Sequence, residues 1–462
     1  MSKEQKSPSR RDVMAATGAA VATSVLANVP LVHAGENNLI QIALVGCGSR
    51  GTGAAENALL ASGGPTRLTA MADVFAGRLG TSHGYLQRTL GRQVDVPEAR
   101  RFIGFNAYRQ AMDSLRAGDV VILATPPAFR WPMFAYAIEK RLHVFMEKPI
   151  SVDGPSTRRM FALGEQAARA NLKVGVGLMC RHCDARKELY QRIRDGQIGD
   201  ITLMRAYRMH GPIGFFNSPP KPDNMTHLMY QIQRFHSFLW ASGGCFSDFY
   251  IHNIDECCWM KNAWPVRAQA SGGRHFRRIE AGNYRGDSVD QNFDSYSVEY
   301  TFGDGTKLFL EGRCIAGCHG QFASYAHGTR AAATISRSGH SPSFCRIFRG
   351  QNITNNNDDA AWRFAREEPV PYQLEWNHLM DAIRNNRPFN EVARGAEASL
   401  ITAMGRYAAH TGQVITRDEM LAHQHEFAPN VDRLTVDSPA PLEWANGRYP
   451  VPQPGITTTR EY

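Results

Sequence analysis

The stretch Ile42–Gly51 reads IALVGCGSRG and decides the N-terminal fold of this chain. Its four apolar residues indicate a buried strand, and the glycines that follow have the spacing G-x-G-x-x-G. Gly46 permits a tight turn, Gly48 lets the backbone approach a pyrophosphate, and Gly51 permits close packing of a helix on the strand. The N-terminus of that helix would present free N–H groups to phosphates. The stretch therefore predicts a dinucleotide-binding unit; a glycine turn without a ligand is the alternative.

An acidic residue stands where the second strand of such a unit ends. Asp73 follows an apolar run and lies 22 residues beyond Gly51. A carboxylate at this spacing accepts hydrogen bonds from ribose hydroxyls and repels a 2′-phosphate, which favours NAD. Arg78 lies near enough in the sequence that NADP stays as the less favoured cofactor.

Strands and helices alternate from residue 39 to about 180, which indicates an α/β fold with a doubly wound parallel sheet. The expected strands of this half are Ile40–Val45, Leu68–Ala72, Val120–Ala124, Val144–Met146 and Val174–Leu178. The second half has turn residues between its strands and few helices, so a mainly antiparallel sheet is expected there. Its expected strands are Ile201–Arg208, Val266–Ser271, Ser295–Phe302, Lys307–Glu311 and Ala332–Ser336, with helices at Tyr372–Asn385 and Gly395–His410.

The N-terminus has the pattern of an export signal. Arg10 and Arg11 form a twin-arginine pair, a weakly apolar run follows from Val13 to Val32, and residues 32–34 offer a small-residue cleavage site. We expect residues 1–34 to be a twin-arginine signal peptide that delivers a folded, cofactor-loaded protein to the periplasm or another extracytoplasmic space. A membrane helix is the alternative, but the run is poor in strong hydrophobes.

The composition is that of an ordinary globular protein, 43% hydrophobic and 21% charged, with a net charge of +9. No block of like charges reaches five or six residues, so we expect no nucleic-acid partner. Nine cysteines, an odd number, argue against a disulfide framework, although single disulfides stay open. Cys180 with Cys183 and Cys314 with Cys318 have metal-like spacing, but packing roles are commoner, and no metal site is predicted.

Glu147-Lys148-Pro149 follows the expected strand Val144–Met146. Proline disfavours a helical Lys148, so the lysine is expected at a strand end, where open parallel sheets bind ligands. An ammonium there can hold a substrate hydroxyl and stabilise an alkoxide. By itself, a lysine before proline is more often a surface residue.

A second polar cluster lies on an expected helix that follows Gly243 and ends near Trp259. Asp248, His252 and Asp255 are spaced four and three residues apart, which places them on one helical face. A carboxylate beside an imidazole fixes its tautomer and raises its basicity, as proton transfer requires. The alternative is a histidine that fills a polar pocket.

Together these features resemble the Gfo/Idh/MocA oxidoreductases over residues 38–425. The shared features are Gly46, Gly48 and Gly51, Asp73, Thr125-Pro126-Pro127, Glu147-Lys148-Pro149, Gly177 with Arg181, Gly196–Gly199 and Gly243-Gly244…Asp248…His252–Asp255. The resemblance implies a Rossmann domain (38–180) and a substrate and oligomerisation domain with an open, mainly antiparallel sheet (181–425). It also implies a homo-oligomer, dimeric or tetrameric. The tail is rich in proline and lacks periodicity from Pro429 onward, so we expect residues 426–462 to form a C-terminal arm.

The resemblance assigns roles by position. His252 would accept the proton, while Lys148 and Asp248 orient and polarise the hydroxyl. The residues expected to bind the cofactor are Gly46, Gly48, Ser49, Arg50, Gly51, Asp73, Thr125, Pro126, Glu147 and Lys148. Those expected to bind substrate are Arg181, Asp255, His210 and Tyr250. Arg130 departs from the family, because many relatives have a histidine there.

Residues 209–242 form a loop-rich stretch with many aromatic side chains. Such rings could stack on a sugar, or they could bury between subunits. The stretch alone leaves both interpretations open.

Three functions are compatible with these sequence features. The favoured one is an NAD-dependent dehydrogenase that moves hydride between the cofactor and a sugar, inositol or related polyol. The second is an exported glycosidase that uses a tightly held, recycled NAD, although such hydrolases often lack the lysine that stands here at position 148. The third is an NAD-bound binding protein without turnover.

Overall fold

The computed structural model describes residues 38–275, 278–281, 284–337 and 344–462. The segment expected to carry the twin-arginine signal, residues 1–34, lies outside the described residues, so export stays a prediction. Residues 40–462 form one compact unit, and the domain boundaries expected after residues 180 and 425 stay predictions. Over the described ranges, no helix combines the length and apolar character needed to cross a membrane.

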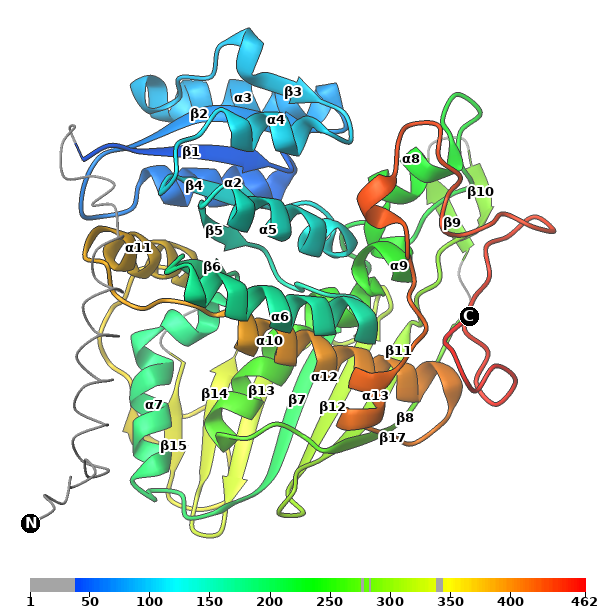
Figure 1. Ribbon diagram of the computed structural model, residues 1–462. Coiled ribbons are helices and arrows are strands. Elements are labelled where there is room, and N and C mark those ends of the chain that lie inside the picture. The colour runs from blue at the N-terminus through cyan, green and yellow to red at the C-terminus, as the bar shows by residue number, and fades with distance from the viewer. Residues whose placement is uncertain (1–37, 276–277, 282–283, 338–343) are drawn as a thin grey trace, which may run out of the picture. The chain divides into compact units, whose positions relative to one another are not determined.

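Six parallel strands form the sheet of the N-terminal half (Figure 1). They are β1 (Ile40–Val45), β2 (Thr66–Asp73), β3 (Arg101–Ile103), β4 (Val120–Leu123), β5 (His143–Met146) and β6 (Val174–Val176). Their order, β3-β2-β1-β4-β5-β6, is that of the doubly wound dinucleotide-binding fold. The predicted parallel Rossmann sheet is therefore confirmed.

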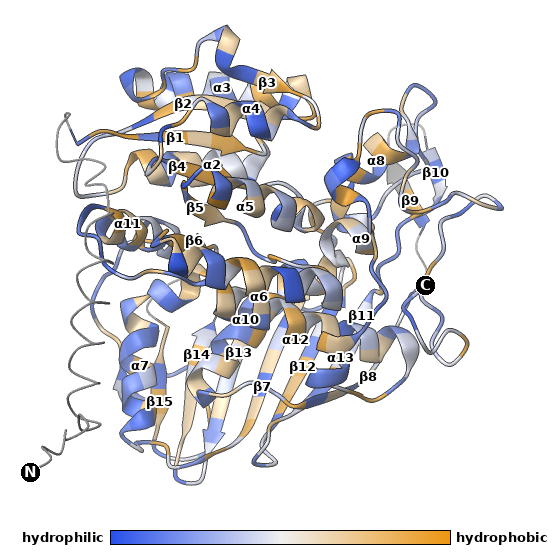
Figure 2. Ribbon diagram, in the orientation of Figure 1, coloured by the Kyte–Doolittle hydropathy of each residue, from blue (hydrophilic) through white to orange (hydrophobic). Residues whose placement is uncertain are grey.

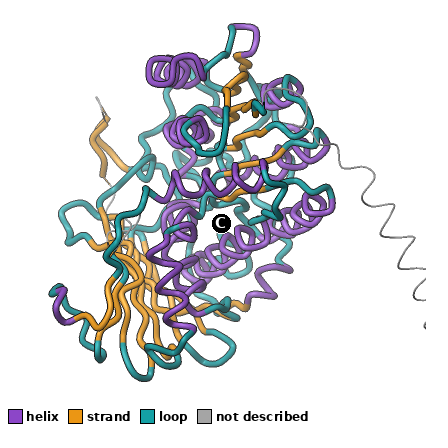
Figure 3. Tube along the Cα trace, turned by 90° about the vertical axis from the view of Figure 1, so that its left-hand side faces the viewer, coloured by secondary structure: helices purple, strands orange, loops and turns teal. Residues whose placement is uncertain are grey.

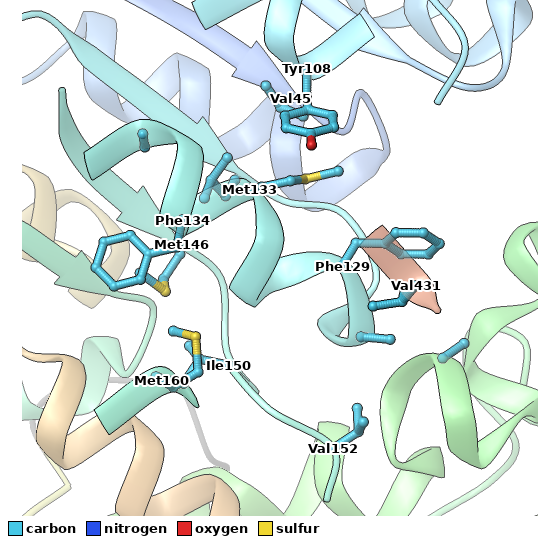
Figure 4. Packing of buried hydrophobic residues seen from close by; sticks show 14 of the residues in the cluster. Val45, Tyr108, Phe129, Met133, Phe134, Met146, Ile150, Val152, Met160 and Val431 are labelled. Carbon is cyan, nitrogen blue, oxygen red and sulfur yellow. The ribbon is translucent and has the colours of Figure 1, made fainter. Parts of the chain in front are cut away.

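Helices cover both faces of this sheet. They are α2 (Ser49–Leu59), α3 (Ala76–Leu90), α4 (Ala107–Asp113), α5 (Arg130–Glu139) and α6 (Gly154–Arg169). Successive side chains of a strand point to opposite faces, so Ala43 and Val45 of β1 pack with α4 and α5, whereas Ile42 and Leu44 pack with α2 and α3. Figure 4 shows part of the first cluster, where Phe134 of α5 lies beside Met146 of β5.

One covering helix comes from far along the chain. Helix α11 (Pro371–Arg384) packs on the α2 side of the parallel sheet, where Trp376 stacks on Phe145 with ring centroids 4.5 Å apart. The N-terminal sheet therefore depends on a segment almost 200 residues beyond its last strand. Burial of a large side chain such as Trp376 contributes on the order of 2–3 kcal/mol.

The second sheet has nine strands in the order β16-β15-β14-β13-β7-β12-β11-β8-β17. The strands are β7 (Ile201–His210), β8 (Arg267–Gly273), β11 (Ser295–Thr301), β12 (Lys307–Cys314), β13 (Gln321–Gly328), β14 (Ala332–Arg337), β15 (Arg346–Phe348), β16 (Ala360–Arg363) and β17 (Ile415–Thr416). All neighbours are antiparallel except β7 and β12. This mainly antiparallel sheet confirms the prediction for the second half.

Two long helices, α10 (Gly244–Lys261) and α12 (Val392–Thr411), pack on one face of the nine-stranded sheet (Figures 1 and 3). Helix α12 is buried over most of its length and is largely apolar, whereas α7 (Asp184–Arg194) is mainly hydrophilic (Figure 2). Side chains of β11 alternate between buried and exposed, so the opposite face meets solvent in this chain. The predicted homo-oligomer stays a prediction.

The remaining elements are shorter. They are α8 (His227–Gln233), α9 (Leu239–Ser242), α13 (Arg417–Ala422), the hairpin β9 (Arg278–Ala281) with β10 (Tyr284–Asp287), and the 3-10 turns η1 (Gly91–Gln93), η2 (Glu98–Arg100), η3 (Pro127–Phe129), η4 (Met179–His182), η5 (Phe235–Ser237), η6 (Asn357–Asp359) and η7 (Val431–Arg433). The C-terminal tail brings η7 against η3, where Val431 lies beside Phe129 (Figure 4).

The tail ends in a buried ion pair. Arg406 of α12 and Glu461 are almost fully buried, and Arg406 Nε lies 2.9 Å from Glu461 Oε2. His410 Nδ1 lies 2.6 Å from the same carboxylate. Burial alone would raise the pKa of Glu461, but Arg406 and His410 outweigh it and lower the pKa to about 2.

We predict that Glu461→Gln lowers the free energy of unfolding at neutral pH by about 3–5 kcal/mol, because it leaves Arg406 buried without its counter-charge. Urea denaturation measures this. The folded pKa is below that of an unfolded glutamate, so the contribution of Glu461 is present above that ordinary value and is lost as the pH falls toward about 2. The difference in free energy of unfolding between wild type and variant should therefore shrink as the pH falls from the ordinary glutamate pKa toward about 2. Glu443→Gln, at an exposed tail carboxylate, is the matched control; an equal loss there would contradict the assignment.

Candidate active site

A cavity of about 1080 Å³ lies at the carboxyl ends of the parallel strands. Its walls include the segments that follow β1, β4 and β5, together with Asp73 at the end of β2. The predicted residues that line it are Gly46, Gly48, Ser49, Arg50, Gly51, Asp73, Thr125, Pro126, Glu147, Lys148, Asp248 and His252. Ligands of doubly wound folds bind in such a crevice. The cavity thus unites the expected cofactor and catalytic residues.

Of the three motif glycines, Gly48 is the one with open space beside it for a ligand. A Cβ on Gly51 would lie 2.0 Å from the Gly46 carbonyl oxygen, and one on Gly46, whose φ is +94°, would lie 2.6 Å from the Ala124 carbonyl carbon. A Cβ on Gly48 would meet nothing within 4 Å. The open side of Gly48 and the free N-terminus of α2 fit a dinucleotide pyrophosphate.

Asp73 is held by the backbone around this turn. Its Oδ2 accepts a hydrogen bond from Cys47 N at 2.7 Å, and its Oδ1 accepts one from Phe75 N at 2.8 Å. Burial raises the pKa of Asp73, and these hydrogen bonds and Arg78 oppose the rise. Arg78 donates to the Gln233 carbonyl at 2.9 Å, so its guanidinium has a partner within the protein.

Arg50 lines the cavity but is engaged in an ionic network. Its Nε lies 2.5 Å from Glu147 Oε1, its Nη2 lies 3.6 Å from Glu375 Oε1, and its guanidinium covers the Tyr372 ring at 4.2 Å. Burial and the nearby Glu147 raise the pKa of Glu375 well above its ordinary value. The network ties the start of α2 to the end of β5 and to α11.

Arg130 stands where many relatives of the resembled family have a histidine, and it stabilises the loop after β4. Its Nη1 donates to the Leu123 carbonyl at 2.6 Å and its Nη2 to the Thr125 carbonyl at 2.9 Å. Burial lowers the pKa of Arg130 to about 10, opposed by Glu147 and Asp248. The side chain thereby holds Thr125 in the cavity wall.

Lys148 and Asp248 meet across the cavity from opposite halves of the chain. Lys148 Nζ donates to Asp248 Oδ1 at 3.1 Å and to the Asp248 carbonyl at 2.6 Å. His236 Nε2 lies 3.0 Å from Asp248 Oδ2. Burial would raise the pKa of Asp248, but Lys148 and His236 lower it well below the ordinary range. Asp248 is therefore an anion that holds two donors in place.

His252 lies one helical turn beyond Asp248 on α10, is almost fully buried, and lines the same cavity. The helix thus presents the carboxylate and the imidazole to one space, as their spacing predicted. Phe249 between them adds an aromatic wall.

The four residues expected to bind substrate do not line the cavity among its described walls. Arg181 and Asp255 form a bidentate ion pair, with Arg181 Nη2 2.7 Å from Asp255 Oδ1. The His210 ring stacks edge-on against Phe249 and lies near Cys314 Sγ. Tyr250 is buried between α10 and the nine-stranded sheet.

The aromatic stretch at residues 209–242 contributes directly to the cavity wall. Its lining residues are Ile213, Gly214, Phe215, Ile232, Phe235 and His236. The sequence indicates no catalytic role for His236, because its contact with Asp248 depends on how η5 packs against α10, and the two residues have no helical spacing. The one available signal was the abundance of histidine and aromatic residues in this stretch.

The cysteines are all free thiols in the structure. Cys183 Sγ accepts a hydrogen bond from Arg186 at 3.1 Å, and Cys314 Sγ lies 3.5 Å from His210 Nε2. Within the described ranges, no group of three or more His, Cys, Asp or Glu side chains could hold a metal ion.

Residues 40–178 match the Gfo/Idh/MocA model, an oxidoreductase family with an NAD-binding Rossmann fold. The match covers this segment, which is less than half of the chain. The prediction of an NAD-binding domain is thereby confirmed. A curated relative, inositol 2-dehydrogenase of Corynebacterium glutamicum (strain R), is 25% identical over 210 residues, which cover 42% of this chain and 55% of that protein. The chain therefore spans about half the length of that relative.

Solved structures share the fold beyond the Gfo/Idh/MocA segment. The aldose-aldose oxidoreductase from Caulobacter crescentus in complex with glycerol has a TM-score of 0.59 at 17% identity, covering 82% of this chain and 99% of that one. The scyllo-inositol dehydrogenase from Lactobacillus casei with bound NAD(H) and scyllo-inositol has a TM-score of 0.58 at 20% identity, with the same coverage. At these identities the likeness shows the fold.

We predict that Asp73→Asn weakens NAD binding by about 10- to 100-fold, because a charged acceptor for the ribose hydroxyls is lost. Calorimetric titration of the purified protein with NAD and with NADP measures this. The preference for NAD over NADP should fall as well, since the carboxylate no longer repels a 2′-phosphate. Asp95→Asn, at an exposed carboxylate that pairs with Arg67, is the control and should leave both affinities unchanged.

Proposed function

We propose that this protein is an NAD-dependent dehydrogenase that oxidises a secondary alcohol of a sugar, inositol or related polyol, or reduces the corresponding ketone. The observation that supports it is the joint placement of Lys148, Asp248 and His252 in the cavity that also contains the glycine turn. A binding protein without turnover would not need a lysine paired with a carboxylate, and a histidine beside them, next to the glycine turn.

The roles proposed for the side chains follow from their contacts. Asp248 holds Lys148 in place, so the ammonium can donate to a substrate hydroxyl and stabilise negative charge on its oxygen. His252 lies close by on α10 and would accept the hydroxyl proton. His236 is a positioning residue, because it engages the second oxygen of Asp248. NAD, when bound at the glycine turn and Asp73, supplies the hydride acceptor.

Several features support a polyol substrate. The cavity is large enough for a dinucleotide with a second, smaller ligand, and Phe215, Phe235 and Phe249 offer faces for the apolar side of a sugar ring. Relatives of the cofactor domain include inositol 2-dehydrogenases.

A glycosidase that recycles its NAD is the second candidate. Two segments from outside the parallel sheet support retention of the cofactor. Arg78 donates a hydrogen bond to the Gln233 carbonyl at the end of α8, and Val431 and Leu434 of the C-terminal tail line the cavity. Retention would suit the proposed export, because no free NAD pool exists outside the cytoplasm. The lysine at position 148 favours the dehydrogenase.

The two candidates make different products. We expect purified protein to form NADH, seen by its near-ultraviolet absorbance, with at least one free polyol or aldose from a panel of inositols, hexoses and their acids. Aryl glycosides should release no aglycone. Release of aglycone without net NADH would instead establish the glycosidase, and neither product with any substrate would remove both candidates.

We predict that Lys148→Met lowers kcat/KM by about 10²- to 10⁴-fold, mainly through kcat, because the hydroxyl loses its donor. Steady-state kinetics with the best substrate measure this, and calorimetry should show that NAD still binds. Lys187→Met, at a partly exposed lysine of α7 outside the cavity, is the matched control. Full activity of Lys148→Met would refute the assignment of Lys148.

A further inference from the structure

Arg208 of β7 differs from the other cations of the cavity wall. The described cations that line the cavity besides Arg208 each have a polar partner: Arg50 with Glu147, Arg78 with the Gln233 carbonyl, Arg130 with two backbone carbonyls, and Lys148 with Asp248. The Arg208 guanidinium has no hydrogen bond or ion pair to any described residue, and its Nε is buried. Asp248, the nearby carboxylate, is occupied by Lys148 and His236.

The setting of Arg208 is apolar on one face. Its guanidinium lies over the Phe322 ring at 3.6 Å from the centroid and near the Phe249 ring at 6.0 Å. Stacking of this kind fixes the plane of the guanidinium and leaves its N–H fork free at the edge. Burial lowers the pKa of Arg208, with Tyr250 and Cys314 opposing, yet a guanidinium stays charged at neutral pH.

Arg208 is partly buried, and a partly desolvated cation without a paired counter-charge costs free energy that is recovered in part when an anion binds. The rigid fork of an arginine matches the two oxygens of a carboxylate or a phosphate. Arg208 belongs to β7 and shares the cavity with Asp248 and Phe249, on the side supplied by the second sheet and α10. An anion at this position would be part of the substrate, because the glycine turn that suits the pyrophosphate belongs to the parallel sheet.

We propose that the substrate of this site is an acidic polyol, whose carboxylate or phosphate group binds the fork of Arg208 while a hydroxyl lies at Lys148 and His252. The inference rests on the proposed function and narrows its substrate class from polyols in general to those that carry an anionic group.

The test measures binding separately from turnover. NAD-loaded protein is titrated calorimetrically with D-glucuronate, D-gluconate, D-glucose 6-phosphate, D-glucose and myo-inositol, and the same compounds are assayed for NADH formation. At least one anionic compound should bind at least tenfold more tightly than the neutral ones. The sugar acids and the phosphate ester distinguish a carboxylate from a phosphate as the group recognised.

Two variants test Arg208 directly. Arg208→Met should weaken binding of the anionic ligand by about 100-fold, Arg208→Lys by less, because the charge remains without the fork. Neither should change the affinity for NAD or for neutral polyols. Arg205→Met, on the same strand but paired with His327 outside the cavity, is the matched control. Thermal denaturation checks that each variant is folded.

The outcomes separate this inference from the proposed function. Equal binding of neutral and anionic compounds, or equal loss for both in Arg208→Met, would overturn the role of Arg208. Weaker NAD binding in Arg208→Met would overturn it as well, since the anion would then belong to the cofactor. If an acid binds through Arg208 but no compound yields NADH, the anion site stands and the dehydrogenase proposal fails.

Discussion

The arrangement of the cavity depends on one buried guanidinium, that of Arg406. Each of its five N–H groups has an acceptor: Nη1 reaches the Gly243 carbonyl and Ser247 Oγ, Nη2 reaches the Val152 carbonyl, and Glu461 accepts from Nε and Nη2. These contacts join the start of α10, the segment that follows β5, and the end of the tail. An unpaired donor on this fully buried cation would be costly, so the contacts hold the three segments together in a single arrangement.

This arrangement explains how two halves of the chain share one site. Lys148 precedes Val152 by four residues, and Asp248 follows Ser247 directly, so the segments that Arg406 joins also carry the donor and the carboxylate. Helix α11 adds a further link, because it covers the parallel sheet from a position late in the chain. The part of the cavity around the glycine turn and the part around Lys148 and Asp248 therefore belong to one packed unit.

Several charged side chains of the cavity wall form ion pairs with one another. Glu147 and Glu375 surround Arg50, and Asp248 takes Lys148 and His236. Such pairing keeps side chains in fixed positions before a ligand arrives, which is the condition for stabilising charge that develops during a reaction. Arg208, stacked on Phe322, differs from the other arginines and the lysine of the described lining because its guanidinium has no hydrogen-bond partner, so its charge is available to a ligand.

The sequence by itself determined the parallel sheet, the glycine turn, Asp73 and the helix that carries Asp248 and His252, because each depends on spacing within a short segment. It also indicated that the second half forms a mainly antiparallel sheet. Only the tertiary structure decided that His236 engages Asp248, that Arg181 and Asp255 satisfy each other, and that α11 and Glu461 complete the packing of distant segments. These contacts join residues with no periodic relation along the chain, so hydrophobic pattern and local propensity contain no information about them. They arise when the two sheets and the tail pack together, because pairing stabilises the charges that this packing buries.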